Sequence, residues 1–295
     1  MSNLSVDHLL GIKYLTTSDI ELIFKTADNF KKIINQPIKK VPSLRDITIA
    51  NLFFENSTRT KLSFELAEKR LSADVINFSS ASSSVTKGET LLDTVNNILA
   101  MKVDIVVMRH PNPGASVFLS RNIDAKIVNA GDGTHEHPTQ ALLDSYSIRE
   151  KYGEVKGKKI VIIGDILHSR VARSQIHVLK SLGVAEIRVA GPKTLVPSSI
   201  STLGVKVYDD VDKAIDGVDV ITTLRIQNER MEAALVPSAQ DFYLEYGLTR
   251  ERLALAGAKA IVMHPGPINR DVEIASEVAD GPQSVILHQV TFGIA

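Results

Sequence analysis

Three hydroxyl side chains and an arginine stand together in the run Ser57-Thr58-Arg59-Thr60. An apolar, β-prone stretch precedes this run and a stretch rich in helix formers follows it, so we expect it where a strand turns into a helix. The free N–H groups and the dipole of a helix start attract an anion, and an arginine can donate two hydrogen bonds to a phosphate. Ser and Thr are also ordinary N-cap residues, so a capped helix with a surface arginine is the alternative to a phosphate site.

A second group of polar residues follows two further strand-like stretches. Met108-Arg109-His110-Pro111 ends one of them, although a charged residue at a strand end often only reaches solvent. The segment Gly131–Gln140 then combines a glycine-rich turn with two histidines and a glutamine at a helix start. His137 and Gln140 lie one helical turn apart, so both can donate hydrogen bonds to the same polar ligand.

The sequence gives little support for a metal or a cofactor. His135, Glu136 and His137 lie in a turn and lack the Glu-x-x-His or His-x-x-x-His spacing that places two metal ligands on one helix face. The loop after Ile160–Gly164 lies where a dinucleotide fingerprint would lie, but it carries only one of the required glycines. Neither a phosphate-binding Gly-x-x-x-x-Gly-Lys loop nor a Gly-x-Ser-x-Gly elbow is present. We therefore expect no metal and no cofactor.

Arginines and amides also follow strand-like stretches in the second half of the chain. Arg170 and Arg173 stand at a predicted helix start, and Leu224–Arg230 supplies further arginines and amides. This composition suits carboxylates, although a solvated surface position explains Arg173 and Arg230 equally well. In His264-Pro265-Gly266-Pro267 two prolines leave carbonyl groups without N–H partners, so this loop can accept hydrogen bonds from a substrate amide.

The elements that must position these residues alternate between strand and helix. This order predicts an α/β protein of two domains, each a mainly parallel sheet flanked by helices, joined by the helix Pro138–Tyr152. The predicted strands are Ile47–Phe54, Val75–Phe78, Ile105–Arg109, Lys126–Asn129, Ile160–Gly164, Ile187–Ala190, Val218–Thr223 and Ala260–Met263. The other predicted helices are Ser18–Ile34, Thr60–Leu71, Glu89–Met101, Ala115–Ser120 and Arg170–Leu182. Ligands bind outside the carboxyl ends of such strands, where the polar segments above fall.

Composition narrows the class of protein. The chain has 295 residues, of which 44% are hydrophobic and 23% charged, enough for about two ordinary globular domains. With 34 basic and 34 acidic residues the net charge is +0, so nothing indicates nucleic acid or an acidic membrane as a partner. The absence of cysteine excludes disulfides and thiolate metal sites and fits a reducing cytosol. The first residues do not resemble a signal peptide, and no apolar run could span a membrane.

Four motifs resemble the carbamoyltransferases in type and in order, over nearly the whole chain. They are Ser57-Thr58-Arg59-Thr60, Met108-Arg109-His110-Pro111, His137-Pro138-Thr139-Gln140 and His264-Pro265-Gly266-Pro267. Within that family the chain is most similar to the catalytic chains that use aspartate. Lys87-Gly88-Glu89-Thr90 follows a serine-rich loop, and Arg225-x-Gln227-x-Glu229-Arg230 follows a strand of the second domain. The His-Cys-Leu-Pro loop and the Ser-Met-Gly segment expected of ornithine carbamoyltransferases are absent.

The resemblance implies an enzyme of de novo pyrimidine biosynthesis that transfers the carbamoyl group of carbamoyl phosphate to L-aspartate. It implies a carbamoyl phosphate-binding domain at 1–137, a linking helix at 138–152 and an aspartate-binding domain at 153–279. The segment 280–295 would pack back on the first domain. It further implies a cytoplasmic homotrimer with shared active sites, and leaves open a higher assembly with regulatory chains or another enzyme of the pathway.

The resemblance also implies a role for individual residues. Carbamoyl phosphate would be bound by Ser57, Thr58, Arg59, Thr60, Arg109, His137, Gln140, Gly266 and Pro267. Arg59, Thr60, Arg109 and His137 would be catalytic, because they would polarise the carbamoyl oxygen. L-Aspartate would be bound by Lys87, Arg170, Arg225 and Gln227. Lys87 and Ser83, or Ser84 in its place, would come from the neighbouring subunit. The rival interpretations are a carbamoyltransferase for another amino acid and a non-catalytic anion-binding scaffold.

Overall fold

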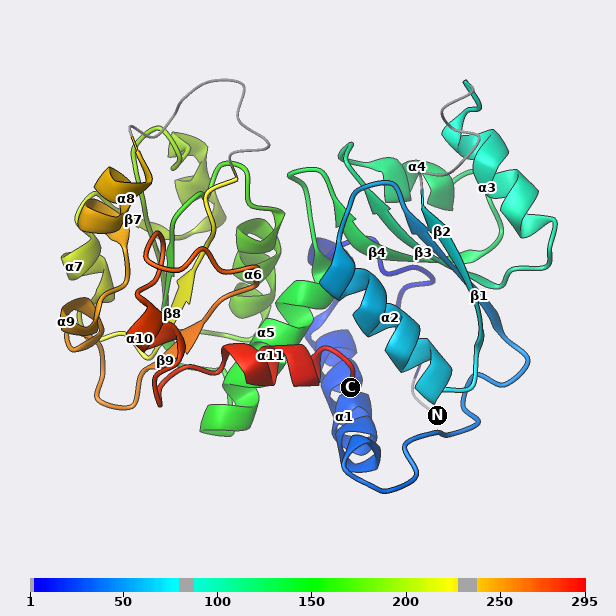
Figure 1. Cartoon of the computed structure of the whole chain (residues 1–295), viewed down its shortest axis with the longest axis horizontal. Coiled ribbons are helices and arrows are strands. Elements are labelled where there is room, and N and C mark those ends of the chain that lie inside the picture. The colour runs from blue at the N-terminus through cyan, green and yellow to red at the C-terminus, as the bar shows by residue number, and fades with distance from the viewer. Residues whose placement is uncertain (1–2, 80–87, 228–237) are drawn as a thin grey trace. The chain divides into compact units, whose positions relative to one another are not determined.

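A computed structural model of the chain describes residues 3–79, 88–227 and 238–295. It divides into two compact units, each with its own parallel sheet (Figure 1). Unit 1 consists of Met1–Thr139 together with Phe292–Ala295, and unit 2 consists of Gln140–Thr291. Among the described helices, none is both long and apolar enough to cross a membrane.

The sheet of unit 1 has four parallel strands in the order β2-β1-β3-β4. The strands are β1 (Thr48–Phe53), β2 (Asp74–Ser79), β3 (Ile105–His110) and β4 (Lys126–Asp132). In the register of the two central strands, Phe53 lies opposite Arg109, and the N–H of Phe54 donates a hydrogen bond of 2.9 Å to the carbonyl oxygen of Arg109. The loop after β1 therefore begins beside Arg109.

Helices cover both faces of this sheet because successive side chains of a strand point to opposite faces, and both faces carry apolar side chains. Phe64 of α2 (Thr58–Arg70) packs on the face formed by Ile49, Phe53 and Val107. The opposite face packs against α3 (Leu91–Leu99) and α4 (Ala115–Ser120). The other helices in the described part of this unit are η1 (Ile12–Tyr14) and α1 (Thr17–Ile34).

The sheet of unit 2 has five parallel strands in the order β7-β6-β5-β8-β9. The strands are β5 (Lys159–Ile163), β6 (Glu186–Ala190), β7 (Lys206–Tyr208), β8 (Val220–Thr223) and β9 (Ile261–Met263). The helices that the structure describes here are α5 (Pro138–Tyr152), α6 (Arg170–Ser181), η4 (Ser198–Leu203), α7 (Val211–Ile215), α8 (Ala239–Tyr246), α9 (Arg250–Leu253), α10 (Ser276–Ala279) and α11 (Ile286–Phe292). The central strands β5 and β8 are almost wholly buried, as expected of a parallel sheet covered on both faces.

These elements confirm the predicted α/β class and the predicted helices at 115–120 and 138–152. Several predicted ends were wrong. α2 begins at Thr58 rather than at Thr60, because Ser57 is its N-cap, and Arg59 therefore lies in the first helical turn. β8 and β9 begin one or two residues later than predicted, at Val220 and Ile261. The prediction also missed β7, a three-residue edge strand with little burial.

Candidate functional site

The start of α2 carries the three hydroxyls and the arginine that were singled out from the sequence. Ser57 is the N-cap residue, yet among the described residues its side chain makes no capping hydrogen bond. Its hydroxyl instead donates a hydrogen bond of 2.8 Å to the hydroxyl of Thr60, one turn further on. The backbone N–H groups of this first turn follow the carboxyl end of β1, where the helix dipole favours an anion.

Arg109 lies at the end of β3 and is held by both neighbouring strands. Its Nη2 atom lies 3.2 Å from a carboxylate oxygen of Glu55, just after β1, and its Nη1 atom donates a 3.4 Å hydrogen bond to the carbonyl of Ala130 on β4. The side chain is only 11% exposed, so Arg109 is not a solvated residue at a strand end. The guanidinium group is positioned beside the start of the loop that leads to α2.

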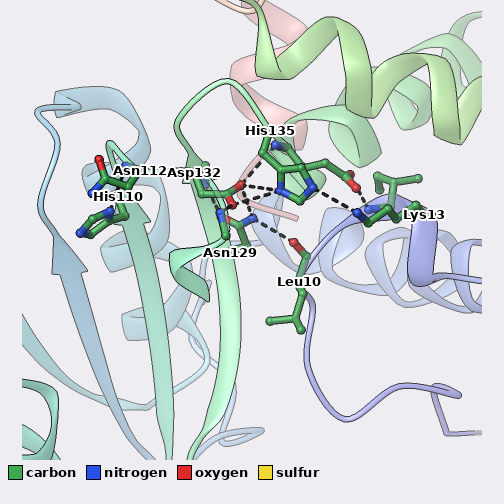
Figure 2. Close-up of polar contacts among 11 residues, drawn as sticks. Leu10, Lys13, His110, Asn112, Asn129, Asp132 and His135 are labelled. Atoms are coloured by element: carbon green, nitrogen blue, oxygen red, sulfur yellow. Dashed lines mark hydrogen bonds and ion pairs between the residues drawn. The ribbon is translucent and has the colours of Figure 1, made fainter. Parts of the chain in front are cut away.

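His110 fixes the turn that follows Arg109. The backbone N–H of Asn112 donates a hydrogen bond of 3.0 Å to Nδ1 of His110, as Figure 2 shows. A backbone N–H can only donate, so Nδ1 carries no proton and the imidazole is neutral. Burial lowers the pKa of His110, which keeps the ring in this form at neutral pH.

Asp132, at the end of β4, holds the glycine-rich turn in place. It accepts hydrogen bonds of 2.7 Å from the N–H of Gly114 and 2.9 Å from the amide of Asn129 (Figure 2). Burial acts to raise the pKa of Asp132, but the hydrogen bonds from His135, Asn129 and Gly114 outweigh it and leave the pKa below its ordinary value. Asp132 is thus an ionised structural anchor that sequence reasoning missed.

His135 and Glu136 take part in the same structural network. Nζ of Lys13 donates to Nε2 of His135 at 3.2 Å, so the proton of the ring lies on Nδ1, 3.1 Å from Asp132 (Figure 2). The carboxylate of Glu136 accepts a hydrogen bond of 2.6 Å from the N–H of Ile12. Within the ranges that the structure describes, no cluster of His, Asp and Glu could hold a metal ion.

His137 and Gln140 stand at the start of α5, as the sequence predicted. His137 directly precedes the helix and is 6% exposed, with its Nδ1 atom 3.4 Å from the hydroxyl of Thr139. Gln140 is also buried, and its amide nitrogen donates a hydrogen bond of 2.8 Å to the carboxylate of Asp144. The amide of Gln140 is therefore oriented by Asp144, and the ring of His137 lies beside the hydroxyl of Thr139.

In unit 2, the loops after β5 and β8 touch each other. The buried carboxylate of Asp165 accepts hydrogen bonds of 3.1 Å from the N–H of His168 and 3.1 Å from the N–H of Gln227. Arg170, the first residue of α6, is buried and follows the first of these loops, and Arg225 lies in the second. Asp165, to which sequence reasoning gave no role, thus ties the Arg170 loop to the loop that carries Arg225 and Gln227.

The loop after β9 is held by its own histidine. The N–H of Gly266 donates a 2.7 Å hydrogen bond to Nδ1 of His264, so the Nε2 proton of that ring lies on the side of Glu273, 3.0 Å away. Glu273 also accepts a 2.6 Å hydrogen bond from the N–H of Asn269. Gly266 has a φ of 63°, which favours glycine, and its peptide bond to Pro267 is cis.

The structure therefore groups the predicted residues within each unit. Unit 1 carries Ser57, Thr58, Arg59, Thr60 and Arg109 at the carboxyl ends of β1 and β3, and His137 follows β4. Unit 2 carries Gln140, Arg170, Arg225, Gln227, Gly266 and Pro267. Ser83, Ser84, Lys87, Glu229 and Arg230 lie outside the described residues.

Two models of known domain families match the chain. Residues 7–150 match the carbamoyl-P binding domain of aspartate/ornithine carbamoyltransferase, and residues 156–295 match the Asp/Orn binding domain of the same family. The chain is also 68% identical, over 294 residues, to the aspartate carbamoyltransferase catalytic subunit of Christiangramia forsetii. That alignment covers 100% of the chain and 94% of the relative.

Solved structures of two relatives share the fold. Aspartate transcarbamoylase from Trypanosoma cruzi, in complex with N-(phosphonacetyl)-L-aspartic acid, has a TM-score of 0.90 and 31% identity, covering 100% of the chain and 94% of that protein. Ornithine carbamoyltransferase from Pyrococcus furiosus has a TM-score of 0.87 and 27% identity, covering 99% and 95%. The fold alone does not separate the aspartate from the ornithine enzymes. The 68% identity to the relative from Christiangramia forsetii favours the aspartate enzymes.

Proposed function

The chain belongs to the aspartate/ornithine carbamoyltransferase family, and we infer that it transfers the carbamoyl group of carbamoyl phosphate to the α-amine of L-aspartate. The products are N-carbamoyl-L-aspartate and phosphate, and the reaction belongs to de novo pyrimidine biosynthesis. The observation that carries this conclusion is 68% identity, over the full chain, to a relative named as an aspartate carbamoyltransferase catalytic subunit.

In the first domain, which we place at 1–137, the start of α2 binds the phosphate of carbamoyl phosphate. Four features support this role: a helix N-terminus, three hydroxyls, Arg59 in the first helical turn and Arg109 beside the same loop. Arg109, Arg59, Thr60 and His137 donate to the carbamoyl oxygen. The carbamoyl amine is held by Gln140 and by the carbonyl groups around Gly266 and Pro267.

In the second domain, which we place at 153–279 after the linking helix 138–152, cationic and amide groups bind L-aspartate. Arg170 and Arg225 bind its two carboxylates, because a guanidinium group can donate two parallel hydrogen bonds to a carboxylate. Gln227 completes this set, and its backbone is held by Asp165. Lys87 and Ser83, or Ser84, are contributed by a neighbouring subunit.

The reaction needs no protein nucleophile. The uncharged α-amine attacks the carbamoyl carbon, a C–N bond forms, and negative charge develops on the carbonyl oxygen. Prearranged donors from Arg59, Thr60, Arg109 and His137 stabilise that charge, as an oxyanion hole does. The bond from carbon to the phosphate oxygen then breaks, and the leaving phosphate takes the amine proton. Positioning of the two substrates supplies the rest of the acceleration.

The assembly that we propose is a cytoplasmic homotrimer with shared active sites. A cysteine-free chain supports a reducing compartment, and the resemblance to the family supports shared sites to which Lys87 and Ser83, or Ser84, contribute. Regulatory chains or another enzyme of the pathway can associate with such a trimer.

A direct assay tests the proposed activity. The purified chain is mixed with carbamoyl phosphate and L-aspartate, and carbamoyl aspartate and phosphate are measured together. Product with ornithine or another amino acid, but none with aspartate, would contradict the assignment. Tight binding of a bisubstrate analogue with a phosphonate and two carboxylates, without turnover of the substrates, would instead indicate a binding scaffold.

A further inference from the structure

Three side-chain amides donate hydrogen bonds to one buried carboxylate in unit 2. Asp144, on α5, accepts from the amide nitrogens of Gln140 at 2.8 Å, Gln289 at 2.7 Å and Gln175 at 2.5 Å. Asp144 is 1% exposed, and none of the three glutamines is more than 7% exposed. Gln140 and Gln289 share the oxygen Oδ1, whereas Gln175 contacts Oδ2.

A backbone donor sets the direction of this network. The N–H of His264 donates a hydrogen bond of 3.0 Å to the side-chain oxygen of Gln289. Since a backbone N–H can only donate, the amide of Gln289 must present its oxygen to His264 and its nitrogen to Asp144. The Oδ1 atom of Asp144 is therefore an acceptor, which fixes its role toward Gln140 as well.

The orientation of the Gln140 amide follows from this. Its nitrogen faces the acceptor Oδ1, so the group that it can offer elsewhere is the carbonyl oxygen. A carbamoyl group differs from an acetyl group by an NH₂ in place of a methyl group. An amide oxygen accepts a hydrogen bond from NH₂ but gains nothing from a methyl group, and a buried polar site of this kind disfavours the analogue that lacks the partner.

We propose that Asp144 is a positioning residue that selects carbamoyl phosphate over acetyl phosphate by turning the carbonyl oxygen of Gln140 toward the substrate amine. This inference rests on the proposed function and on the role given there to Gln140. Through Gln289 and His264 the same carboxylate is linked to the loop that carries Gly266 and Pro267, the second group expected to hold that amine.

The test compares the values of kcat/KM for two acyl donors and does not rely on a single rate. The values of kcat/KM for carbamoyl phosphate and acetyl phosphate, each with saturating L-aspartate, give a selectivity ratio. In Asp144→Ala the amide of Gln140 is free to turn, and we expect the ratio to fall about tenfold, which corresponds to about 1.4 kcal/mol. The loss should fall mainly on carbamoyl phosphate. A merely structural role would lower both values in the same proportion, and that result would overturn the inference.

Two further variants connect the effect to Gln140. Gln140→Leu should lower the ratio by a similar factor, and the double variant should lower it no further, because both changes remove one interaction. Additive losses would contradict the proposal. If Asp144→Ala fails to fold, Gln140→Leu still tests the proposal. An unchanged selectivity ratio in Gln140→Leu would show that the side-chain oxygen of Gln140 does not select between the two acyl donors.

Asp144→Asn serves as the conservative control. Its remaining oxygen can still accept from Gln140 and Gln289, while its new NH₂ group faces Gln175. The side-chain oxygen of Gln175 is buried and makes no hydrogen bond within the described part of the chain, so it can accept from that NH₂ group once the amide turns. We expect Asp144→Asn to keep the selectivity ratio of the unchanged chain, and a loss like that of Asp144→Ala would contradict this geometry.

Arg188→Met is the control for stability. Arg188 is 7% exposed and donates to the backbone carbonyl groups of Lys213, Ala214 and Asp216 in the same unit, so its loss should destabilise the fold without changing the ratio. A changed ratio in Arg188→Met would show that loss of stability alone alters selectivity and would overturn the inference. If the chain without any substitution does not turn over carbamoyl phosphate and aspartate, that result would contradict the proposed function itself.

Discussion

Asn51 on β1 donates a hydrogen bond of 2.7 Å to the carboxylate of Glu68 on α2, and both side chains are buried. The second oxygen of Glu68 and the side-chain oxygen of Asn51 are also buried, and neither has a hydrogen-bond partner among the residues that the structure describes. Burial raises the pKa of Glu68 to about 7, although the hydrogen bond from Asn51 acts in the opposite direction. Glu68 is therefore a carboxyl group that changes its charge close to neutral pH inside the first domain.

This pair predicts a pH-dependent stability. The folded chain holds the proton of Glu68 up to about pH 7, whereas the unfolded chain loses it near 4.5, so the free energy of unfolding should decrease as the pH rises between these values. Glu68→Gln stays neutral and should be more stable than the unchanged chain at pH 8, by up to about 3 kcal/mol, and similar at pH 4.5. Urea denaturation at several pH values measures this difference.

Glu65→Gln is the matched control, because the pKa of Glu65 on the same helix is lowered, mainly by its hydrogen bond with Lys69. In Glu65→Gln the free energy of unfolding should still decrease as the pH rises, as it does in the chain without substitutions. Unfolding free energies of Glu68→Gln that run parallel to those of the unchanged chain over the whole pH range would refute the prediction.

Arg59→Ala should remove nearly all turnover without unfolding the chain. Arg59 lies in the first turn of α2 and is half-buried, so its loss leaves the core intact but takes away a donor to the phosphate and to the developing oxyanion. Loss of one such donor lowers kcat by about 10²- to 10³-fold. Steady-state rates and thermal melting, with Lys69→Ala in the last turn of the same helix as control, test this. A rate near that of the unchanged chain would remove Arg59 from the mechanism.

Gly164→Ala should impair aspartate binding specifically. Gly164 has a φ of 127°, and a Cβ atom there would lie 2.5 Å from the carbonyl oxygen of Leu224. The new methyl group must push apart the loops after β5 and β8, which carry Arg170, Arg225 and Gln227. A misplacement of about 1 Å can reduce activity by up to about 10²-fold, so the KM for aspartate should rise strongly.

The dissociation constant for carbamoyl phosphate in Gly164→Ala should change little by comparison. Gly217→Ala is the control, since Gly217 has a φ of 62° but open space around its Cβ position. If the two substitutions raise the KM for aspartate equally, backbone strain rather than the contact with Leu224 causes the weaker aspartate binding of Gly164→Ala.

The shared active site predicts complementation between two inactive chains. Arg59→Ala and Lys87→Ala should each be inactive alone. In the proposed trimer every site needs Arg59 from one chain and Lys87 from its neighbour, and each variant lacks one of these two side chains at every site. After the chains are mixed and reassembled, some sites combine an intact Arg59 with an intact Lys87 and activity should return. Native mass spectrometry should find three chains in the active species. A monomeric mass with full activity would reject shared sites.

Local sequence patterns predicted the elements of this fold well. Buried strands such as β5 consist of continuous apolar residues, and the proline at the start of α5 marked that helix. The polar residues at the strand ends could also be named, because parallel sheets gather their ligands at one edge. The edge strand β7 was missed because its three residues, Lys206–Tyr208, are not buried and carry no such pattern.

The supporting contacts could not be predicted because they join residues that are far apart in sequence. Glu55 reaches Arg109 across 54 positions, and Asp165 reaches the N–H of Gln227 across 62. Asp144 meets Gln289 across 145 positions, and nothing local to either residue indicates the other. Such pairs follow from the strand order, which local sequence patterns do not reveal.

Unit 2 is, in topological terms, an insertion. Phe292–Ala295 belong to unit 1, where the ring of Phe292 lies 5.6 Å from the ammonium group of Lys31, so the chain leaves unit 1 after Thr139 and later returns to it. Asp144 and Gln289 join the two ends of the inserted unit by a buried hydrogen bond. Folding of the insertion therefore closes the long loop whose entropy would otherwise oppose the return of the final residues. We expect the inserted unit to fold first and the host unit to be completed only afterwards.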